Sequence, residues 1–356
     1  MINRFNRLSS ILKTAGVDAI LINKPESRRY LTGFAGSAGT VLCDCACTYR
    51  KLFVDFRYIE QARLQATQWD IVKSVQNSLA EIAVLAGSAG FKRIGFESDF
   101  ITVDAKAGLD KAFADFELVP IKLADLRKEK DDSEIRIIKT AVEIAESALG
   151  KVIKEIRVGV KERDVAISLE TYMRKAGADA SAFDIIVASG VRSALPHGRA
   201  SDKLIENGDF ITIDFGAYFE GYNSDITRTF VVGKASDKHR EVYNTVLEAQ
   251  LAGVRAVKAG VLNQSVDKVA RDYITAAGYG EYFGHGLGHG LGMLVHEAPG
   301  LSYAAEAAIL QINNIVTVEP GIYIPGFGGV RIEDDVVVKE YGCEILTSFD
   351  KRLIEL

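Results

Sequence analysis

Apolar residues recur at helical spacing in long segments of the chain and form short, dense runs elsewhere. Helical periodicity predicts helices over residues 3–15, 133–156, 162–175, 237–258 and 265–277. Runs rich in Ile, Val, Leu and Phe predict strands over residues 17–22, 52–56, 71–75 and 93–96. Helices and strands that alternate in this way are typical of an α/β domain.

A charged stretch over residues 122–132 separates two patterns of elements. Before it, short strands alternate with helices; after it, two long helices precede strands, and two more helices precede a glycine-dense stretch and further strands. A chain of 356 residues is too long for one ordinary core. We therefore predict two domains, residues 1–124 and 125–356. The repeated order of helices and then a hairpin suggests that the second domain has two related halves.

Two aspartates lie in a predicted hairpin over residues 211–230. Asp214 and Asp225 are equidistant from a turn near residues 219–221, so an unbulged register would place them opposite each other. An aspartate on the exposed face of a hairpin is the ordinary explanation for either residue alone. Two neighbouring carboxylates among Ile, Thr and Phe instead require protonation or a bound cation.

The chain repeats this arrangement near its end. Glu319 and Glu333 lie symmetrically about Gly326, within a turn over residues 325–329. They too are predicted to face each other across a strand pair. Together the two hairpins supply four carboxylates for bound ions.

Three of the five histidines fall within twelve residues, in the glycine-dense segment 284–297: His285, His289 and His296. A phosphate-binding loop is the rival interpretation, but the segment lacks the Gly-Lys-Ser/Thr ending of such loops. Four carboxylates and one imidazole suit two divalent ions such as manganese, cobalt or zinc. Such ions acidify water and stabilise the oxyanion of an attacked amide, so the set predicts hydrolysis.

Composition narrows the function further. The formal net charge of −5 provides no basic field for nucleic acid. The N-terminal residues lack the apolar core of a signal peptide, and no window approaches the roughly 18 apolar residues of a membrane helix. Four cysteines are too few for a disulfide framework. We expect a cytoplasmic protein without nucleic-acid or membrane partners.

The acidic and histidine motifs resemble those of the pita-bread metallopeptidases, peptidase family M24, and in particular its proline-specific branch of aminopeptidase P and prolidase. The matching motifs are Ile-Asp-Phe-Gly, Ser-Asp-Ile-Thr-Arg-Thr, Gly-His-Gly-Leu-Gly, Val-Glu-Pro-Gly and Arg-Ile-Glu-Asp, which carry Asp214, Asp225, His289, Glu319 and Glu333. By this resemblance Asp225 and Glu333 bridge two metal ions, Asp214 binds one, and His289 and Glu319 complete the other. Glu319 is also expected to carry a proton.

The same resemblance implies roles for residues around the ions. His197 and His296 are expected to contact the scissile amide, and His285 to line the proline side of the site. Arg331 and Tyr222 are weaker candidates for substrate binding, since each has an ordinary interpretation as a surface or packing residue.

Residues 30–39 resemble a turn in the N-terminal domain of aminopeptidase P-like enzymes. The resemblance therefore implies a creatinase/prolidase-like α/β domain followed by a pita-bread catalytic domain, and a homodimer. It also implies manganese as the native metal, with cobalt and zinc as alternatives.

The expected activity is that of an Xaa-Pro aminopeptidase acting on peptides with proline at the second position. Specificity for proline comes from the resemblance alone. A prolyl bond has no amide hydrogen and a fixed φ, so it needs a dedicated site. The alternatives are a strict Xaa-Pro dipeptidase (prolidase), a pita-bread binding protein without catalysis, and a creatinase-like amidinohydrolase; the last two disagree with the intact ligand set.

Overall fold

The computed structural model describes residues 2–75 and 79–356. The chain divides into two compact units, residues 1–127 and residues 128–356. The boundary predicted after residue 124 falls within a short 3-10 helix, η2 (Ala124–Arg127). In the described part of the chain, no helix is long and apolar enough to cross a membrane.

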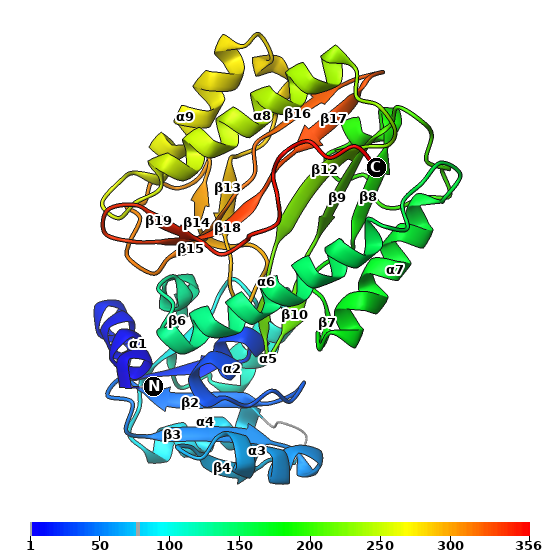
Figure 1. Cartoon of the computed structure of the whole chain (residues 1–356). Coiled ribbons are helices and arrows are strands. Elements are labelled where there is room, and N and C mark those ends of the chain that lie inside the picture. Colours follow the sequence, from blue (N-terminus) through cyan, green and yellow to red (C-terminus); the bar gives the residue numbers. More distant parts are fainter. Residues whose placement is uncertain (1, 76–78) are drawn as a thin grey trace. The chain divides into compact units, whose positions relative to one another are not determined.

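The first unit contains a six-stranded mixed sheet with strand order β4-β3-β2-β1-β5-β6 (Figure 1). Its strands are β1 (Ala19–Ile22), β2 (Thr40–Asp44), β3 (Arg50–Val54), β4 (Asp70–Lys73), β5 (Arg93–Glu97) and β6 (Glu117–Ile121). Its helices are α1 (Ile2–Ala15), α2 (Pro25–Thr32), α3 (Ile59–Gln65), α4 (Leu79–Ser88) and α5 (Val103–Ala112), with the 3-10 helix η1 (Phe56–Tyr58). The α/β prediction is confirmed. Periodicity does not predict β6, which contains Pro120; proline is tolerated there because β6 is an edge strand.

The second unit combines four long helices with short strands. The helices are α6 (Asp132–Val152), α7 (Glu162–Lys175), α8 (Asp237–Ala256) and α9 (Asn263–Ala276). The strands of its first half are β7 (Ala180–Ser181), β8 (Ile186–Ser189), β9 (Phe210–Phe215), β10 (Ala217–Phe219), β11 (Tyr222–Asn223) and β12 (Ile226–Val231). Those of its second half are β13 (Gly288–Gly290), β14 (Glu297–Leu301), β15 (Ile315–Val318), β16 (Gly321–Ile324), β17 (Gly328–Arg331), β18 (Asp334–Val338) and β19 (Cys343–Ile345). Two further 3-10 helices are η3 (Gly190–Ala194) and η4 (Gly280–Tyr282).

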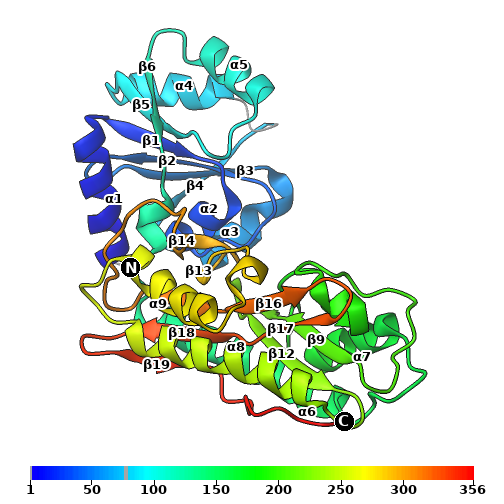
Figure 2. The same cartoon turned by 90° about the horizontal axis from the view of Figure 1, so that it is seen from above.

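Each half of this unit has its own apolar core beneath a pair of helices. Side chains of α6 and α7 pack with those of β8, β9 and β12 in one cluster. Side chains of α8 and α9 pack with those of β15, β16, β17 and β18 in the other. Figure 2 shows α8 and α9 lying along the strands of the second half. The predicted order, a helix pair and then strands, thus occurs twice.

The register of the first hairpin differs from the predicted one. Asp214 pairs with Thr227, and Tyr218 pairs with Asn223, so the turn is centred one residue later than the sequence suggests. The direct opposition predicted for Asp214 and Asp225 is therefore wrong. Phe219 pairs with Tyr222, so Glu220 and Gly221 form the turn, with φ values of 47° and 90°. The two aspartates are offset by two positions, which keeps both on the same face.

The register of the second hairpin agrees with the prediction. Gly321 pairs with Arg331 on one side of the acidic positions, and Val318 pairs with Asp334 on the other. Both pairings place Glu319 opposite Glu333. Gly326, with a φ of 77°, lies at the centre of the turn, where a left-handed conformation favours glycine.

Gly216 lies between β9 and β10, where the backbone packs closely against the other side of the first hairpin. A Cβ atom at this position would lie 1.8 Å from the Ser224 carbonyl oxygen, a backbone atom that cannot rotate away. We predict that Gly216→Ala lowers the melting temperature of the unit by about 5 °C or more, because the strands must separate to admit the methyl group. Differential scanning calorimetry measures this shift.

Gly150→Ala is the matched control, since Gly150 lies in α6 and an added Cβ would be 4.0 Å from the nearest atom, in the Phe349 ring. Alanine favours the helix, so the melting temperature should stay the same or rise by about 1–3 °C. Equal behaviour of the two variants would contradict the predicted clash.

Candidate metal centre

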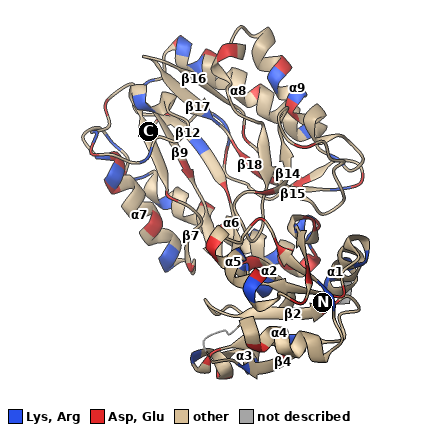
Figure 3. Cartoon of the chain, turned by 180° about the vertical axis from the view of Figure 1, so that it is seen from behind, with Lys and Arg blue, Asp and Glu red and all other residues tan. Residues whose placement is uncertain are grey.

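The acidic residues of the second unit lie where its strands are interrupted. Asp214 is near the end of β9, and Asp225 lies between β11 and β12. Glu319 lies between β15 and β16, and Glu333 between β17 and β18. At these breaks the backbone passes from one set of strand pairings to the next. A carboxylate at a break can therefore point into the interior without disrupting the backbone hydrogen bonds of either sheet. Figure 3 shows acidic positions around β9 and β18 within this strand-rich interior.

These carboxylates border one cavity of about 970 Å³ in the second unit. The same cavity is lined by the other predicted site residues except Tyr222, so the full set is Asp214, Asp225, His289, Glu319, Glu333, His197, His285, His296 and Arg331. These side chains come from segments more than 130 residues apart in the sequence, and the fold brings them together.

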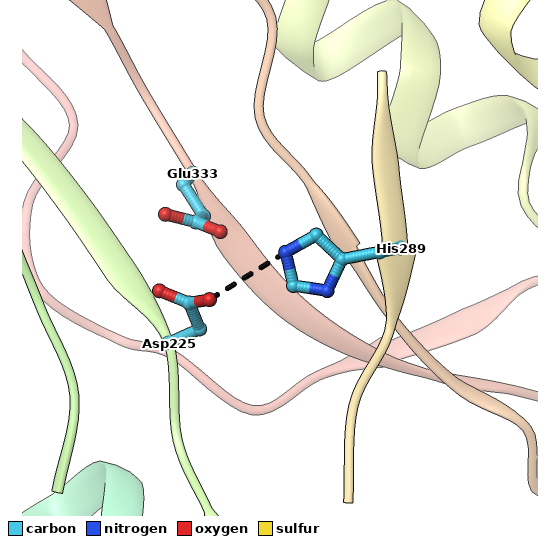
Figure 4. A group of neighbouring side chains, drawn as sticks. All are labelled: Asp225, His289 and Glu333. Atoms are coloured by element: carbon cyan, nitrogen blue, oxygen red, sulfur yellow. Dashed lines mark ion pairs between the residues drawn. The ribbon is translucent and has the colours of Figure 1, made fainter. Parts of the chain in front are cut away.

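Three of the predicted ligands converge most closely. Asp225, His289 and Glu333 each present one donor atom within 4.8 Å of the other two (Figure 4). The Nε2 atom of His289 lies 3.6 Å from Asp225 Oδ2 and 3.2 Å from Glu319 Oε1. Thr227 donates a hydrogen bond of 2.6 Å to Glu333 Oε2 and orients that carboxylate.

The side chain of Asp214 forms an ion pair with Arg331. The Nη2 atom of Arg331 donates to Asp214 Oδ2 at 2.6 Å, and both side chains are largely buried. The other oxygen, Oδ1, is buried and has no hydrogen-bond partner among the described residues. A buried carboxylate oxygen without a partner is costly unless a ligand such as a metal ion satisfies it.

The cluster carries more negative charge than its own cations compensate. Burial raises the pKa of Asp225 well above its ordinary value, and the charges of Glu333 and Asp214 raise it further. Burial likewise raises the pKa of Glu333, with added repulsion from Glu319 and Asp214. Two buried carboxylates with raised pKa values are typical of a site that binds cations.

The side chains of Glu319 and His289 are in direct contact, with 3.2 Å between Glu319 Oε1 and His289 Nε2. Burial opposes ionisation of Glu319, but the hydrogen bond and charge of His289 outweigh it, so the pKa of Glu319 lies well below its usual range. The same contact raises the pKa of His289 against the opposing effect of burial. Glu319 is therefore an ionised carboxylate, able to accept a proton or coordinate a cation.

Glycines place His289 against two neighbouring strands. A Cβ atom on Gly288 would lie 2.0 Å from the Thr317 carbonyl oxygen, and one on Gly290 would lie 2.7 Å from backbone atoms of Ala298. These glycines allow close approach of β13 to β14 and β15, which carries the imidazole into the site.

The other histidines surround the carboxylates at different depths. His296 lies beside His289, with ring centroids 4.2 Å apart, and burial lowers the pKa of His296. His285 is deeper, and its Nε2 atom forms a hydrogen bond of 2.9 Å with the Tyr323 hydroxyl. His197 lies on an exposed loop that borders the cavity. All three imidazoles therefore adjoin the space beside the acidic cluster.

Tyr222 is the candidate that the structure places elsewhere. Its side chain is buried, and its hydroxyl donates to Glu134 Oε1 at 2.9 Å. Glu134 also accepts from the Asp131 backbone and so closes the capping box at the start of α6. Tyr222 thus anchors a helix end, in agreement with its packing interpretation.

Tyr323 lines the cavity, although the sequence does not single it out. Its hydroxyl accepts a hydrogen bond of 2.8 Å from Arg331 Nη1 and contacts His285. A Cβ atom on Gly321 would lie 2.4 Å from this hydroxyl, and one on Gly329 would lie 2.9 Å from the tyrosine ring. The signal in the sequence is therefore a glycine two residues before the tyrosine in β16 and another opposite it in β17, which leave room for its side chain.

The donor set fits divalent cations. It offers four carboxylates and one imidazole around a shared space, with an unsatisfied buried oxygen and strong mutual repulsion. Oxygen-rich sites with one histidine suit manganese, cobalt or zinc, whereas thiolates are absent from the lining residues.

Comparison with known proteins gives full-length matches. Residues 4–128 match the Creatinase/Prolidase N-terminal domain, and residues 136–340 match Metallopeptidase family M24. A Bacillus subtilis protein named uncharacterized peptidase YqhT is 46% identical over 355 residues, covering 99% of this chain and 100% of that protein.

Solved structures agree over the same extent. A structure described as Xaa-Pro dipeptidase from Bacillus anthracis has a TM-score of 0.96 and 49% identity, covering 100% of this chain and 99% of the other. One described as X-Pro aminopeptidase from Thermotoga maritima has a TM-score of 0.90 and 41% identity, covering 99% of both chains. These matches confirm the predicted fold, a creatinase/prolidase-type domain followed by a pita-bread domain. The chain belongs to metallopeptidase family M24.

Proposed function

We propose that this protein is an Xaa-Pro aminopeptidase, which uses divalent metal ions to hydrolyse the bond between an N-terminal residue and a following proline. The observation that carries the proposal is the cavity bordered by five predicted metal ligands and three further histidines. Membership of a metallopeptidase family supports metal dependence, and the titles of the similar structures name Xaa-Pro peptidases.

In this proposal Asp214, Asp225, His289, Glu319 and Glu333, which border one cavity, would hold the pair of ions. When bound, a pair of divalent cations polarises the substrate carbonyl and makes water more acidic. Glu319 accepts the proton lost by the attacking water and passes it to the leaving prolyl nitrogen. An ionised carboxylate is the form that can accept this proton, and Glu319 borders the cavity in contact with His289.

The histidines orient the substrate. His197 and His296 contact the scissile amide and the tetrahedral species that forms from it. The lowered pKa of His296 keeps its imidazole neutral near pH 7, so it can donate one hydrogen bond without adding charge. His285 and its partner Tyr323 border the space for the proline ring. Arg331 acts on the site indirectly, by fixing Asp214 and Tyr323.

The cations of the cavity favour an aminopeptidase over a strict dipeptidase. A strict dipeptidase must bind the free carboxylate of the second residue, and arginine or lysine is the usual partner. Among the described residues, Arg199 and Arg331 are the cations that line the cavity. Arg331 is engaged by Asp214, and the exposed Arg199 pairs with Asp184 at 2.7 Å. Neither is a dedicated carboxylate receptor, which supports turnover of longer peptides.

A strict Xaa-Pro dipeptidase is the second candidate. Its support is the 49% identity to the Bacillus anthracis structure, whose title names that activity. The two candidates share the same metal chemistry and differ only in whether the substrate can continue beyond proline.

Measuring the amount of bound metal tests the proposed metal centre. Protein incubated with manganese and dialysed should retain about two ions per chain by inductively coupled plasma mass spectrometry. Asp225→Asn should lose at least about half of this metal and lower kcat/KM at least about 100-fold, because Asp225 is proposed to contact both ions. Asp272→Asn, at an exposed residue of α9 that pairs with Lys268, is the control and should change neither value. Undiminished metal in Asp225→Asn would contradict the ligand assignment.

Substrate length separates the two candidates. With added manganese, we expect the enzyme to release the first residue from both Ala-Pro and Ala-Pro-Ala, and to spare Ala-Ala-Ala. Liquid chromatography of the products measures each rate. Turnover of Ala-Pro alone would favour the strict dipeptidase, while full activity after chelation would remove the metallopeptidase mechanism.

A homodimer, a cytoplasmic location and manganese as the native metal complete the proposal. Static light scattering at working concentration tests the first of these. A monomeric mass would contradict the dimer without affecting the proposed chemistry.

A further inference from the structure

A buried glutamate outside the cavity lies behind the loop that carries His197. Glu162 is the first residue of α7, and its side chain is fully buried. It does not line the cavity and is not among the predicted site residues. An ionised carboxylate is costly to bury, so its partners should reveal what it does.

The side-chain partners of Glu162 belong to one segment, residues 189–201, here called the loop, which begins at the last residue of β8 and includes η3. Ser189 donates to Oε1 through its backbone nitrogen at 2.7 Å and its hydroxyl at 2.9 Å. Ser201 donates to Oε2 through its backbone nitrogen at 3.1 Å and its hydroxyl at 2.6 Å. The Nε atom of Arg192 lies 3.1 Å from Oε2. The carboxylate therefore joins the start of the loop to its end.

Arg192 extends this connection toward the histidine. Its Nε atom contacts Glu162, and its Nη2 atom donates to the Arg199 carbonyl at 2.7 Å. The Arg199 backbone nitrogen in turn donates to the His197 carbonyl at 2.9 Å. The chain of contacts from Glu162 thus reaches the backbone of His197.

The His197 side chain has little else to fix it. It is exposed, and within residues 2–75 and 79–356 its imidazole forms no hydrogen bond. Two other contacts also hold the loop: Gly329 of β17 donates to the Ser193 hydroxyl at 2.8 Å before His197, and Arg199 forms a β-bridge with Ile186 of β8 after it. The position of the imidazole therefore depends on the loop backbone, and Glu162 is the side chain that links the two ends of this loop.

The environment of Glu162 suits an ionised carboxylate. It accepts several hydrogen bonds, one of them from a guanidinium, and charge-assisted bonds of this kind are the strong ones. It also lies at the N-terminus of α7, where the helix dipole stabilises negative charge. A glutamine at this position would replace two acceptors with one acceptor and one donor, and could not satisfy both ends of the loop.

We propose that Glu162 is a positioning residue, which closes the loop from Ser189 to Ser201 and thereby holds the His197 imidazole at the wall of the cavity. This inference rests on the proposed function, in which His197 contacts the scissile amide. Small displacements of such groups reduce rates strongly, by up to about 100-fold for 1 Å.

A double-mutant cycle tests the inference. Glu162→Gln should lower kcat/KM for Ala-Pro-Ala at least about 10-fold and leave the bound manganese unchanged, because Glu162 touches none of the metal ligands. In the His197→Ala background the same substitution should have almost no effect, since the group that it positions is gone. Equal losses in both backgrounds would overturn the proposal, because general damage to the fold does not depend on His197.

Asp164→Asn is the matched control. It removes the same kind of charge from the same helix end, at an exposed position. This variant should keep wild-type kcat/KM, which separates the effect of the loop from that of the helix dipole. If Glu162→Gln does not fold, Ser201→Ala replaces it in the cycle, with the same expected dependence on His197.

Hydrogen-deuterium exchange gives a readout that is independent of activity. In Glu162→Gln, amides of residues 195–201 should exchange faster, while those of β9 and β12 keep their protection. Unchanged exchange in the loop would overturn the proposal. A wild-type protein inactive toward every Xaa-Pro peptide would refute the proposed function instead, and the exchange result would still decide whether Glu162 holds the loop.

Discussion

The second unit is organised around the repulsion between buried carboxylates. Asp225 and Glu333 are almost fully buried, the charge of Glu333 adds to the cost of ionising Asp225, and Arg331 forms its ion pair with Asp214. A fold built for stability alone would place apolar residues in such positions. A bound cation relieves this repulsion. The same arrangement that lowers the stability of the metal-free protein therefore creates affinity for divalent ions.

Interrupted strands are what make this arrangement compatible with a packed core. Each acidic residue lies at or near a break between two ladders, where the backbone can turn without losing the hydrogen bonds on either side. Glycines at nearby positions then bring the strands and their side chains close together. Gly288 and Gly290 serve His289 in this way, and Gly321 and Gly329 serve Tyr323.

The sequence predicts the elements and the candidate ligands well because both depend on local patterns. Helical periodicity locates α7 at its observed bounds, and the turn glycines give the register of the hairpin that carries Glu319 and Glu333. The predicted centre of the first turn is wrong by one residue because Glu220 and Gly221 form the turn together, and a positive φ at glutamate is uncommon and not evident from the sequence. The contacts of Tyr222, Tyr323 and Glu162 depend on distant segments, so a local pattern does not reveal them.

The acidic residues are divided between the two halves of the second unit, and this division determines what a break in the chain between the halves would do. Asp214 and Asp225 precede α8, whereas His289, Glu319 and Glu333 come after it. A nick in the short connection before α8, at residues 232–236, would leave each fragment with an incomplete set of donors. Under the proposed ligand assignment, metal affinity in such a split protein would report how tightly the fragments associate, since neither piece carries all five proposed ligands.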